Sequence, residues 1–179
     1  MNKKIIIGLL TCASLAYGCQ SPSTQNKPAS TLADSSSNQA FDSQIDGKEV
    51  KLFQLKNDKL AITLTNYGAR LVSLNVPNKD GQMTDVILGY DSANEYKENY
   101  NNFYGAIVGR YGNRIGKASF KLNGEVYSLE KNDGENSLHG GTNGVYNKVW
   151  DVVSSTETSI TLAYTSPDKE AGYPGTVKM

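Results

Sequence analysis

The segment LAITLTNYGARLVSLNV, residues 60–76, carries the clearest indication of the fold class. In Leu60–Thr65 and again in Val72–Val76, large apolar residues alternate with small or polar ones. A period of two places alternate side chains on opposite faces of a β-strand, so one face of each strand packs on a core. Asn66–Gly68 separates the two runs with residues that favour turns. We therefore predict two neighbouring β-strands in this segment.

Two hairpins are predicted farther along the chain. Phe120–Leu122 and Glu125–Leu129 flank Asn123-Gly124, a dipeptide that accepts the positive φ angles of a type I′ turn. Val149–Val153 and Ser159–Tyr164 show strand patterns on either side of a short polar loop. Each pair is expected to form two antiparallel strands.

A short strand and one helix are predicted between these segments. Val86–Leu88 is continuously apolar, as a short buried strand is. Ser92 with Glu95 three residues later forms a capping box, which predicts a short helix that ends near Tyr100. Many short strands with turn signals and almost no helix favour an all-β fold, a sandwich or a barrel.

The amino-terminal residues have the features of an export signal. Two lysines precede the apolar run Ile5–Ala16, which is shorter than the roughly 20 residues of a membrane-spanning helix. Leu15–Cys19 resembles a bacterial lipobox, a signal in which the peptidase cuts before the cysteine and lipid is attached to its sulfur. We expect residues 1–18 to be a signal peptide and Cys19 to be lipidated. The alternative is a plain secretory signal in which Cys19 is incidental.

Composition divides the rest of the chain into a tether and a domain. Residues 19–46 are rich in Ser, Thr, Asn, Gln and Ala and bury too little apolar surface to offset the entropy of ordering. Residues 47–179 carry the strand patterns. We therefore expect an exported, membrane-anchored lipoprotein in the periplasm or on the cell surface. After a cut before Cys19, one cysteine remains, which excludes a disulfide and a cysteine metal site.

The charge balance excludes one class of partner. The chain has 18 basic and 18 acidic residues, so no strongly basic surface is available for a nucleic acid. The sequence has one histidine, His139, and offers too few ligands for a metal ion around it. We expect neither nucleic acid nor metal.

The densest set of polar residues lies in two short segments. GRYGNRI, residues 109–115, places two arginines and an asparagine among glycines, and NSLHGG, residues 136–141, contains His139. Arginine, asparagine and histidine together offer donors and an acceptor that can read the hydroxyls of a small polar molecule. Two other interpretations remain open. The arginines could be loop cations paired with carboxylates, and His139 could stabilise a turn by bonding to the backbone.

Four motifs in this region resemble those of the galactose mutarotase, or aldose 1-epimerase, family. GRYGNRI resembles the family's G-R-x-x-N-R-I, and NSLHGG matches its N-S-L-H-G-G. Lys148-Val149-Trp150 resembles its K-x-W motif. SPDKEAGYPG, residues 166–175, resembles S-P-D-G-E-E-G-Y-P-G but departs from it at Lys169 and Ala171. The resemblance covers residues 50–179.

The resemblance implies a fold, a reaction and a site. The family folds as a large antiparallel β-sandwich, the supersandwich, and interconverts the α and β anomers of aldoses such as galactose and glucose without a cofactor. Asn113, Arg114 and His139 match positions that contact the sugar. The family's general acid, a second histidine, and its general base, a glutamate, match no residue here and are expected beyond Met179. We therefore expect an incomplete part of the sandwich that is inactive alone.

Two other functions fit the same residues. A surface lipoprotein that binds carbohydrate without converting it would need the three sugar-contacting positions and no acid or base. A related sugar-phosphate epimerase would need a cationic phosphate pocket, which Arg110 and Arg114 could supply. The NSLHGG motif favours a free aldose over a phosphorylated one.

Overall fold

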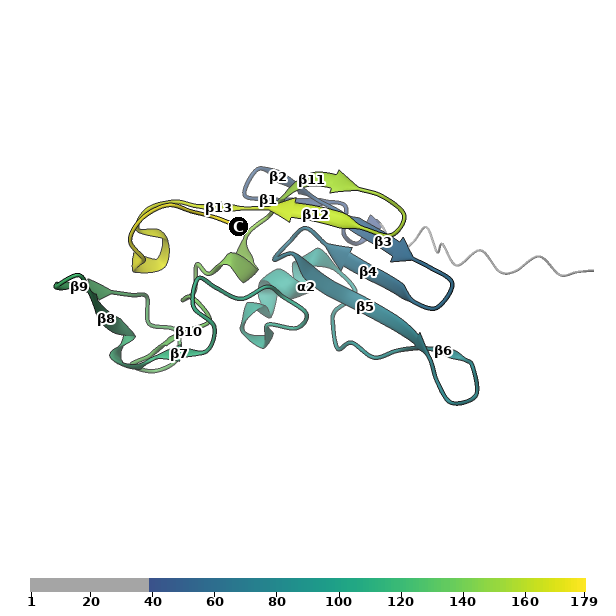
Figure 1. Cartoon of the computed structure of the whole chain (residues 1–179), viewed down its shortest axis with the longest axis horizontal. Helices are drawn as coiled ribbons and strands as arrows, with labels where there is room; N and C mark the ends of the chain where they lie inside the picture. Colours follow the sequence, from purple (N-terminus) through teal and green to yellow (C-terminus); the bar gives the residue numbers. More distant parts are fainter. Residues whose placement is uncertain (1–38) are drawn as a thin grey trace, which may run out of the picture. The chain divides into compact units, whose positions relative to one another are not determined.

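The computed structural model describes residues 39–179 (Figure 1). The expected signal peptide at residues 1–18, the lipidation site Cys19 and the first part of the tether lie outside the described residues. Within residues 39–179, no helix is long and apolar enough to cross a membrane.

The first described strands begin earlier than the sequence predicts. β1 (Ser43–Ile45) pairs antiparallel with β2 (Lys48–Val50). Phe41 and Ile45 are 2% and 3% exposed and belong to the core. The expected end of the tether at residue 46 therefore lies too far along the chain. These two apolar residues stand among polar neighbours, but burial of each stabilises the fold by roughly 1.5–3 kcal/mol, which offsets the cost of ordering the segment.

A four-stranded antiparallel sheet contains the segment 60–76. Its order is β3 (Leu52–Lys56), β4 (Ala61–Thr65), β5 (Arg70–Pro77) and β6 (Met83–Asp85). Ile62 of β4 lies opposite Leu55 of β3 and Leu74 of β5. The two strands predicted between residues 60 and 76 are thereby confirmed.

The predicted strand at Val86–Leu88 is wrong. Strand β6 ends at Asp85, and Val86 and Leu88 are 57% and 74% exposed. One carboxylate oxygen of Asp85 accepts the backbone N–H groups of Leu74 and Ile87 at 2.9 and 3.0 Å. A side chain thus takes the place of the next backbone acceptor in the ladder, and regular pairing stops there.

The helix has the predicted cap. α2 (Ala93–Glu98) follows Ser92, whose hydroxyl oxygen accepts the backbone N–H of Glu95 at 3.2 Å. The Glu95 carboxylate in turn accepts the backbone N–H of Asp91 at 3.1 Å. These reciprocal bonds satisfy amide groups that have no partner inside the first turn of a helix. Tyr96 on the buried face of α2 is fully enclosed in the core.

Both predicted hairpins are present. In the first, β8 (Ser119–Leu122) and β9 (Glu125–Ser128) join through Asn123 and Gly124, whose φ angles of 53° and 87° are those expected of a type I′ turn. The second pairs β11 (Asp151–Ser155) with β12 (Ile160–Ala163).

The remaining elements are short. They are two strand pairs and four 3-10 turns: β7 (Arg114–Ile115) with β10 (Ser137–Leu138), β13 (Thr165–Ser166) with β14 (Val177–Lys178), η1 (Tyr100–Asn102), η2 (Gly116–Ala118), η3 (Val145–Asn147) and η4 (Glu170–Gly172). All strand pairs are antiparallel. The described residues therefore form the all-β, antiparallel architecture that the sequence predicts.

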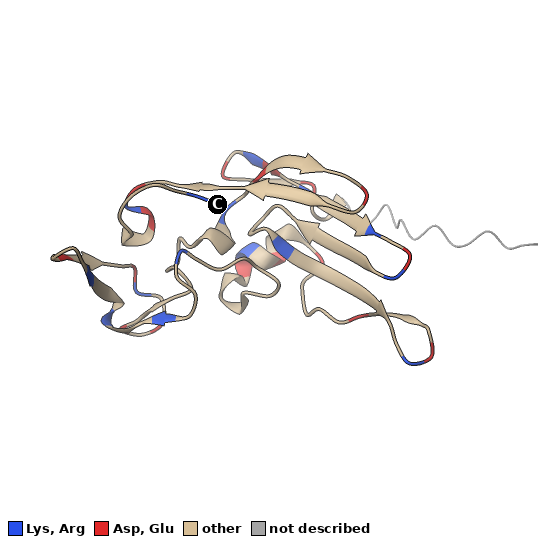
Figure 2. Cartoon of the chain, viewed as in Figure 1, with Lys and Arg blue, Asp and Glu red and all other residues tan. Residues whose placement is uncertain are grey.

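Charged residues lie mainly at turns and chain bends, and the strands of the large sheet carry few of them (Figure 2). Arg70, at the start of β5, differs from these surface charges because it is buried, with 1% of its surface exposed. Its guanidinium donates to the backbone oxygens of Tyr67, Tyr104 and Tyr146 at 3.3, 3.3 and 2.9 Å. It also lies 4.6 Å from the ring centre of Tyr96. A buried cation here joins three segments of chain that are distant in sequence.

Candidate functional site

The short β7–β10 pair brings the two polar motifs together. Arg114 lies opposite Leu138 in this antiparallel ladder. One residue beyond, the backbone N–H of His139 donates to the carbonyl oxygen of Asn113 at 3.0 Å. The ladder thus brings His139 to the neighbouring residues Asn113 and Arg114, which precede it by 26 and 25 positions in the sequence. All three lie at one end of the strand pair.

A hydrogen bond orients the imidazole of His139. The backbone N–H of Asn113 donates to its Nδ1 atom at 3.0 Å. Since Nδ1 accepts, the proton of the neutral ring is on Nε2, which is then a donor. Burial, and secondly the Arg114 guanidinium, lower the pKa of His139 from its usual 6.5. His139 is therefore neutral at pH 7 and presents an N–H group.

An aromatic residue supports the ring of His139. The edge of one ring faces the other, with 4.7 Å between the centres of Phe103 and His139 and 64° between their planes. Phe103 makes a similar contact, at 4.8 Å, with Tyr146, which is fully buried. Such edge-to-face pairs contribute about 0.5–1.5 kcal/mol beyond their buried area. The imidazole is thereby held by a backbone N–H group and by an edge-to-face contact with Phe103.

Two acceptors hold the guanidinium of Arg114. Its Nε atom donates to Oδ2 of Asp133 at 2.6 Å, and one terminal nitrogen donates to Oδ1 of Asn113 at 3.3 Å. The side chain of Arg114 is 54% exposed. Among the described residues, no acceptor bonds to the other terminal nitrogen, Nη2, so this group can donate to a ligand.

Close backbone packing beneath the site requires glycine at position 140. Gly140 has a φ of 96°, a region that side chains disfavour, and a Cβ atom there would overlap the carbonyl oxygen of Gly109. The NSLHGG motif and the GRYGNRI motif therefore touch through their backbones as well as through side chains. This contact explains why a glycine follows the histidine.

Arg110 has a different role from Arg114. Its Nε donates to the hydroxyl of Ser166, and its terminal nitrogens donate to four backbone oxygens between 2.6 and 3.1 Å away. These acceptors are Ser166, Pro167, Pro174 and Gly175. Arg110 therefore ties loop 166–175 to the segment that carries Asn113.

The two departures in the SPDKEAGYPG motif occupy unusual backbone conformations. Lys169 and Ala171 have φ angles of 67° and 50°, in the left-handed region that favours glycine. Between them, Glu170 is largely buried and accepts hydrogen bonds from the hydroxyls of Tyr164 and Ser166. Its bonds hold the loop closed, which compensates for the strained residues on either side.

Sequence reasoning missed two residues of the site, Phe103 and Asp133. Asp133 precedes the NSLHGG motif by three positions, and no sequence pattern distinguishes it from Glu135. In the structure Glu135 pairs with Lys131 at 2.6 Å and is 81% exposed, so it is a solvated charge and not part of the site. The proposal that arginines here pair with carboxylates holds for Arg114, while His139 does bond to the backbone.

No metal centre is found within residues 39–179, since nowhere do three or more His, Cys, Asp or Glu side chains gather suitably. One hollow, of about 480 Å³, is lined by residues of β2, β3 and β11, away from His139. The side chain of Arg114 is 54% exposed, so the polar site is open to solvent at this residue.

A family model described as aldose 1-epimerase matches residues 51–179. Among curated relatives, the galactose mutarotase of Sus scrofa is 39% identical over 132 residues, or 73% of this chain and 37% of that protein. The aldose 1-epimerase of Escherichia coli (strain K12) is 34% identical over 131 residues, or 73% of this chain and 38% of that protein. The chain thus spans less than two fifths of the length of these relatives.

Solved structures agree with the relatives. The GalM/aldose epimerase homologue of C. elegans superimposes with a TM-score of 0.69 and 32% identity, over 72% of this chain and 40% of that one. Galactose 1-epimerase of Lactobacillus acidophilus NCFM gives a TM-score of 0.65 and 33% identity, over 76% of this chain and 40% of that one. The expected galactose mutarotase-like β fold is confirmed for the part of the chain that aligns.

Proposed function

The chain belongs to the aldose 1-epimerase family, and from this premise we propose that Asn113, Arg114 and His139 bind an aldose sugar. The observation that carries the proposal is the set of donors without a partner among the described residues at the end of the β7–β10 pair. Nη2 of Arg114 and Nε2 of His139 both have hydrogens to donate, and they come from motifs that the ladder places side by side.

Donors of this kind suit a sugar because its hydroxyl and ring oxygens all accept hydrogen bonds. A neutral histidine donor needs no counter-charge in the ligand, and the lowered pKa of His139 keeps it neutral at pH 7. An arginine that is already held by Asp133 and Asn113 loses little further freedom when a ligand binds. The site therefore matches an uncharged, oxygen-rich ligand.

Contacts of Arg110 speak against the sugar-phosphate alternative. A phosphate pocket built from Arg110 and Arg114 needs both guanidinium groups to point at the ligand. All three nitrogens of Arg110 instead bond to oxygens of loop 166–175. One exposed arginine, itself paired with Asp133, remains for a dianion, and this favours a free aldose.

We propose that the described residues bind the sugar and do not themselves open its ring. Ring opening needs a base for the anomeric hydroxyl proton and an acid for the ring oxygen. His139 is the sole histidine of the sequence and its Nδ1 is already hydrogen-bonded. The carboxylates of Asp133 and Glu130 are engaged by Arg114 and Asn143 respectively. Anomer exchange therefore calls for acid and base groups from other residues.

The test measures galactose binding and anomer exchange separately. The purified chain is titrated with galactose and followed by NMR, and the rotation of fresh α-galactose is followed by polarimetry. We expect saturable binding that weakens at least about fivefold in Arg114→Ala and in His139→Asn, because a lost buried or ligand-facing hydrogen bond costs roughly 1–3 kcal/mol. We expect the rate of mutarotation to equal that of the buffer.

A matched control separates the site from general charge effects. Lys48 is a cation of similar exposure, 48%, and pairs with Asp151 away from the site. Lys48→Met should leave galactose binding unchanged. Wild-type affinity in both site variants would show that these residues are structural. Accelerated mutarotation by the chain would instead show that its own residues supply the acid and the base.

A further inference from the structure

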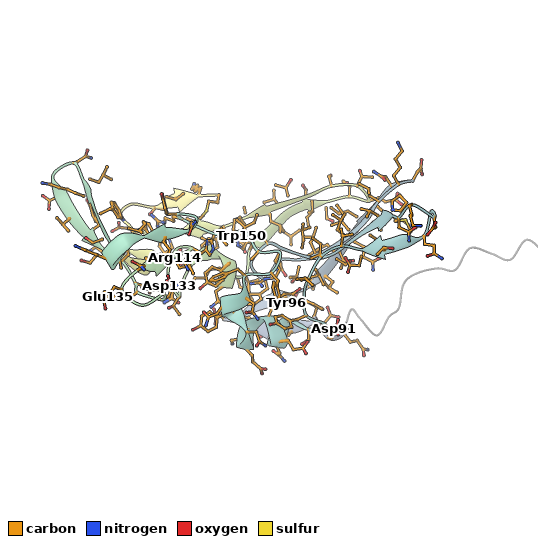
Figure 3. The ribbon with its side chains drawn as sticks, turned by 90° about the horizontal axis from the view of Figure 1, so that it is seen from below. Asp91, Tyr96, Arg114, Asp133, Glu135 and Trp150 are labelled. Atoms are coloured by element: carbon orange, nitrogen blue, oxygen red, sulfur yellow. The ribbon has the colours of Figure 1, made fainter. Side chains whose placement is uncertain are left out.

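One carboxylate makes the shortest polar contact to the proposed sugar site. Oδ2 of Asp133 accepts the Nε–H of Arg114 at 2.6 Å (Figure 3). Side chains of Asp133 and Arg114 are 33% and 54% exposed, so the pair lies partly in solvent. Exposed ion pairs contribute little to stability, with a median near 0–1 kcal/mol. The short contact between Asp133 and Arg114 therefore needs an explanation other than a contribution to stability.

A tight turn fixes the position of this carboxylate. The backbone N–H of Asp133 donates to Asn136 O at 3.3 Å, and the N–H of Asn136 donates back to Asp133 O at 3.0 Å. Asn132, just before it, bonds through its side chain to both the N–H and the carbonyl of Leu138, at 2.6 and 2.9 Å. Leu138 is the cross-strand partner of Arg114. Asp133 and Arg114 are thus anchored to the same strand pair.

The bond to Nε determines which donors of Arg114 remain. A carboxylate at Nε and the Asn113 oxygen at Nη1 hold the planar group at two points. A long arginine side chain otherwise loses up to about 2 kcal/mol of rotamer entropy when it is fixed by a ligand. With the plane already set, Nη2, to which no acceptor among the described residues bonds, remains available as a donor.

We propose that Asp133 is a positioning residue of the sugar site, which fixes the guanidinium of Arg114 in the orientation that receives an aldose oxygen on Nη2. The inference rests on the proposed function. It assigns Asp133 no contact with the sugar and no proton transfer. Glu135, two residues later and labelled in Figure 3, has the same charge. It bonds to Lys131 at 2.6 Å and not to Arg114, so it has no such role.

The pair Asp133 and Glu135 provides a matched experiment on the full chain. Asp133→Asn and Glu135→Gln each remove one negative charge from the same turn. Galactose affinity is measured by NMR titration, and the Nε proton of Arg114 is observed in nitrogen-15-labelled protein. We expect Asp133→Asn to weaken galactose binding about tenfold and to speed exchange of the Arg114 Nε proton. Glu135→Gln should change neither quantity.

Two further variants keep the test decisive. Asp133→Glu restores a carboxylate and should recover part of the affinity and the slow exchange of the Arg114 Nε proton. Asp133→Ser, suited to the same turn, replaces Asp133→Asn if that variant does not fold. Wild-type affinity in Asp133→Asn, or an equal loss in Glu135→Gln, would overturn the positioning role while leaving the sugar site intact. A wild-type chain that binds no galactose would overturn the proposed function as well.

Discussion

Arg70→Met is expected to destabilise the protein more than Arg114→Met does. Arg70 is 1% exposed and donates to the carbonyl oxygens of Tyr67, Tyr104 and Tyr146. Burial lowers the pKa of this guanidinium, and within residues 39–179 no carboxylate counters the effect. Methionine has a similar length and fills the space, but it leaves the three carbonyls without their donor.

The magnitude follows from those three acceptors. An unsatisfied buried polar group costs about 1–3 kcal/mol, so the two buried carbonyls cost roughly 2–6 kcal/mol, and the part-buried carbonyl of Tyr104 adds less. Removal of a desolvated charge and burial of the methionine side chain offset part of this loss. We expect a net loss of about 4 kcal/mol, a large fraction of the 5–15 kcal/mol that is typical of a folded domain.

Urea denaturation followed by fluorescence measures this loss directly. Trp150 is the single tryptophan of the sequence and is 6% exposed, so its emission reports on unfolding of the described residues. Arg70→Lys keeps the charge but not the planar fork, and it should also lose at least 2 kcal/mol of unfolding free energy, on the order expected for two lost acceptors. Arg114→Met makes the same chemical change at an exposed site and should lose less than about 1 kcal/mol.

A loss below about 1 kcal/mol in Arg70→Met would refute this reasoning, since the three carbonyls would then have found other donors or water. Full recovery of stability in Arg70→Lys would refute it differently. That outcome would assign the effect to the cation over the Tyr96 ring and not to the three directed bonds.

The other predictions concern His139 and Cys19. His139 should titrate below pH 6.5, because its pKa is lowered. Its contribution to the free energy of unfolding should be complete above pH 6.5 and be lost as pH falls through the lowered pKa. NMR of the single imidazole measures the titration, and a midpoint at or above 6.5 would contradict the prediction. We propose from Gly18-Cys19 that the chain is a lipoprotein. Cys19→Ala should release it from membranes or leave the precursor uncut, and unchanged fractionation and processing would argue for a plain signal.

Local patterns predicted much of the fold. The alternation in residues 60–76, the Asn123-Gly124 turn and the Ser92 cap each became the expected element. Each depends on neighbours in sequence, whose φ angles and side-chain directions are governed by local sterics. Val86–Leu88 failed because a side chain, that of Asp85, took the place of a backbone acceptor in the ladder.

The candidate site was predicted only in part. Resemblance to a family pointed to Asn113, Arg114 and His139, and the structure places them together, but their contact with a sugar stays a prediction. Phe103 and Asp133 carry no sequence signal for their roles. An aromatic residue in a loop and an acid in a polar turn are common, and their partners lie 36 and 19 positions away.

The sequence by itself determined the all-β class, the two hairpins, the short capped helix and the family. Each of these depends on residues that are close together in the sequence or on motifs that occur in a fixed order. The tertiary structure alone decided that Arg70 is buried, that Arg110 closes a loop and that Asp133 holds Arg114. The sequence around an arginine does not show whether its guanidinium will bond to water, to carbonyl groups or to a carboxylate. Which of these it meets depends on how distant strands pair, and that pairing is a property of the whole chain.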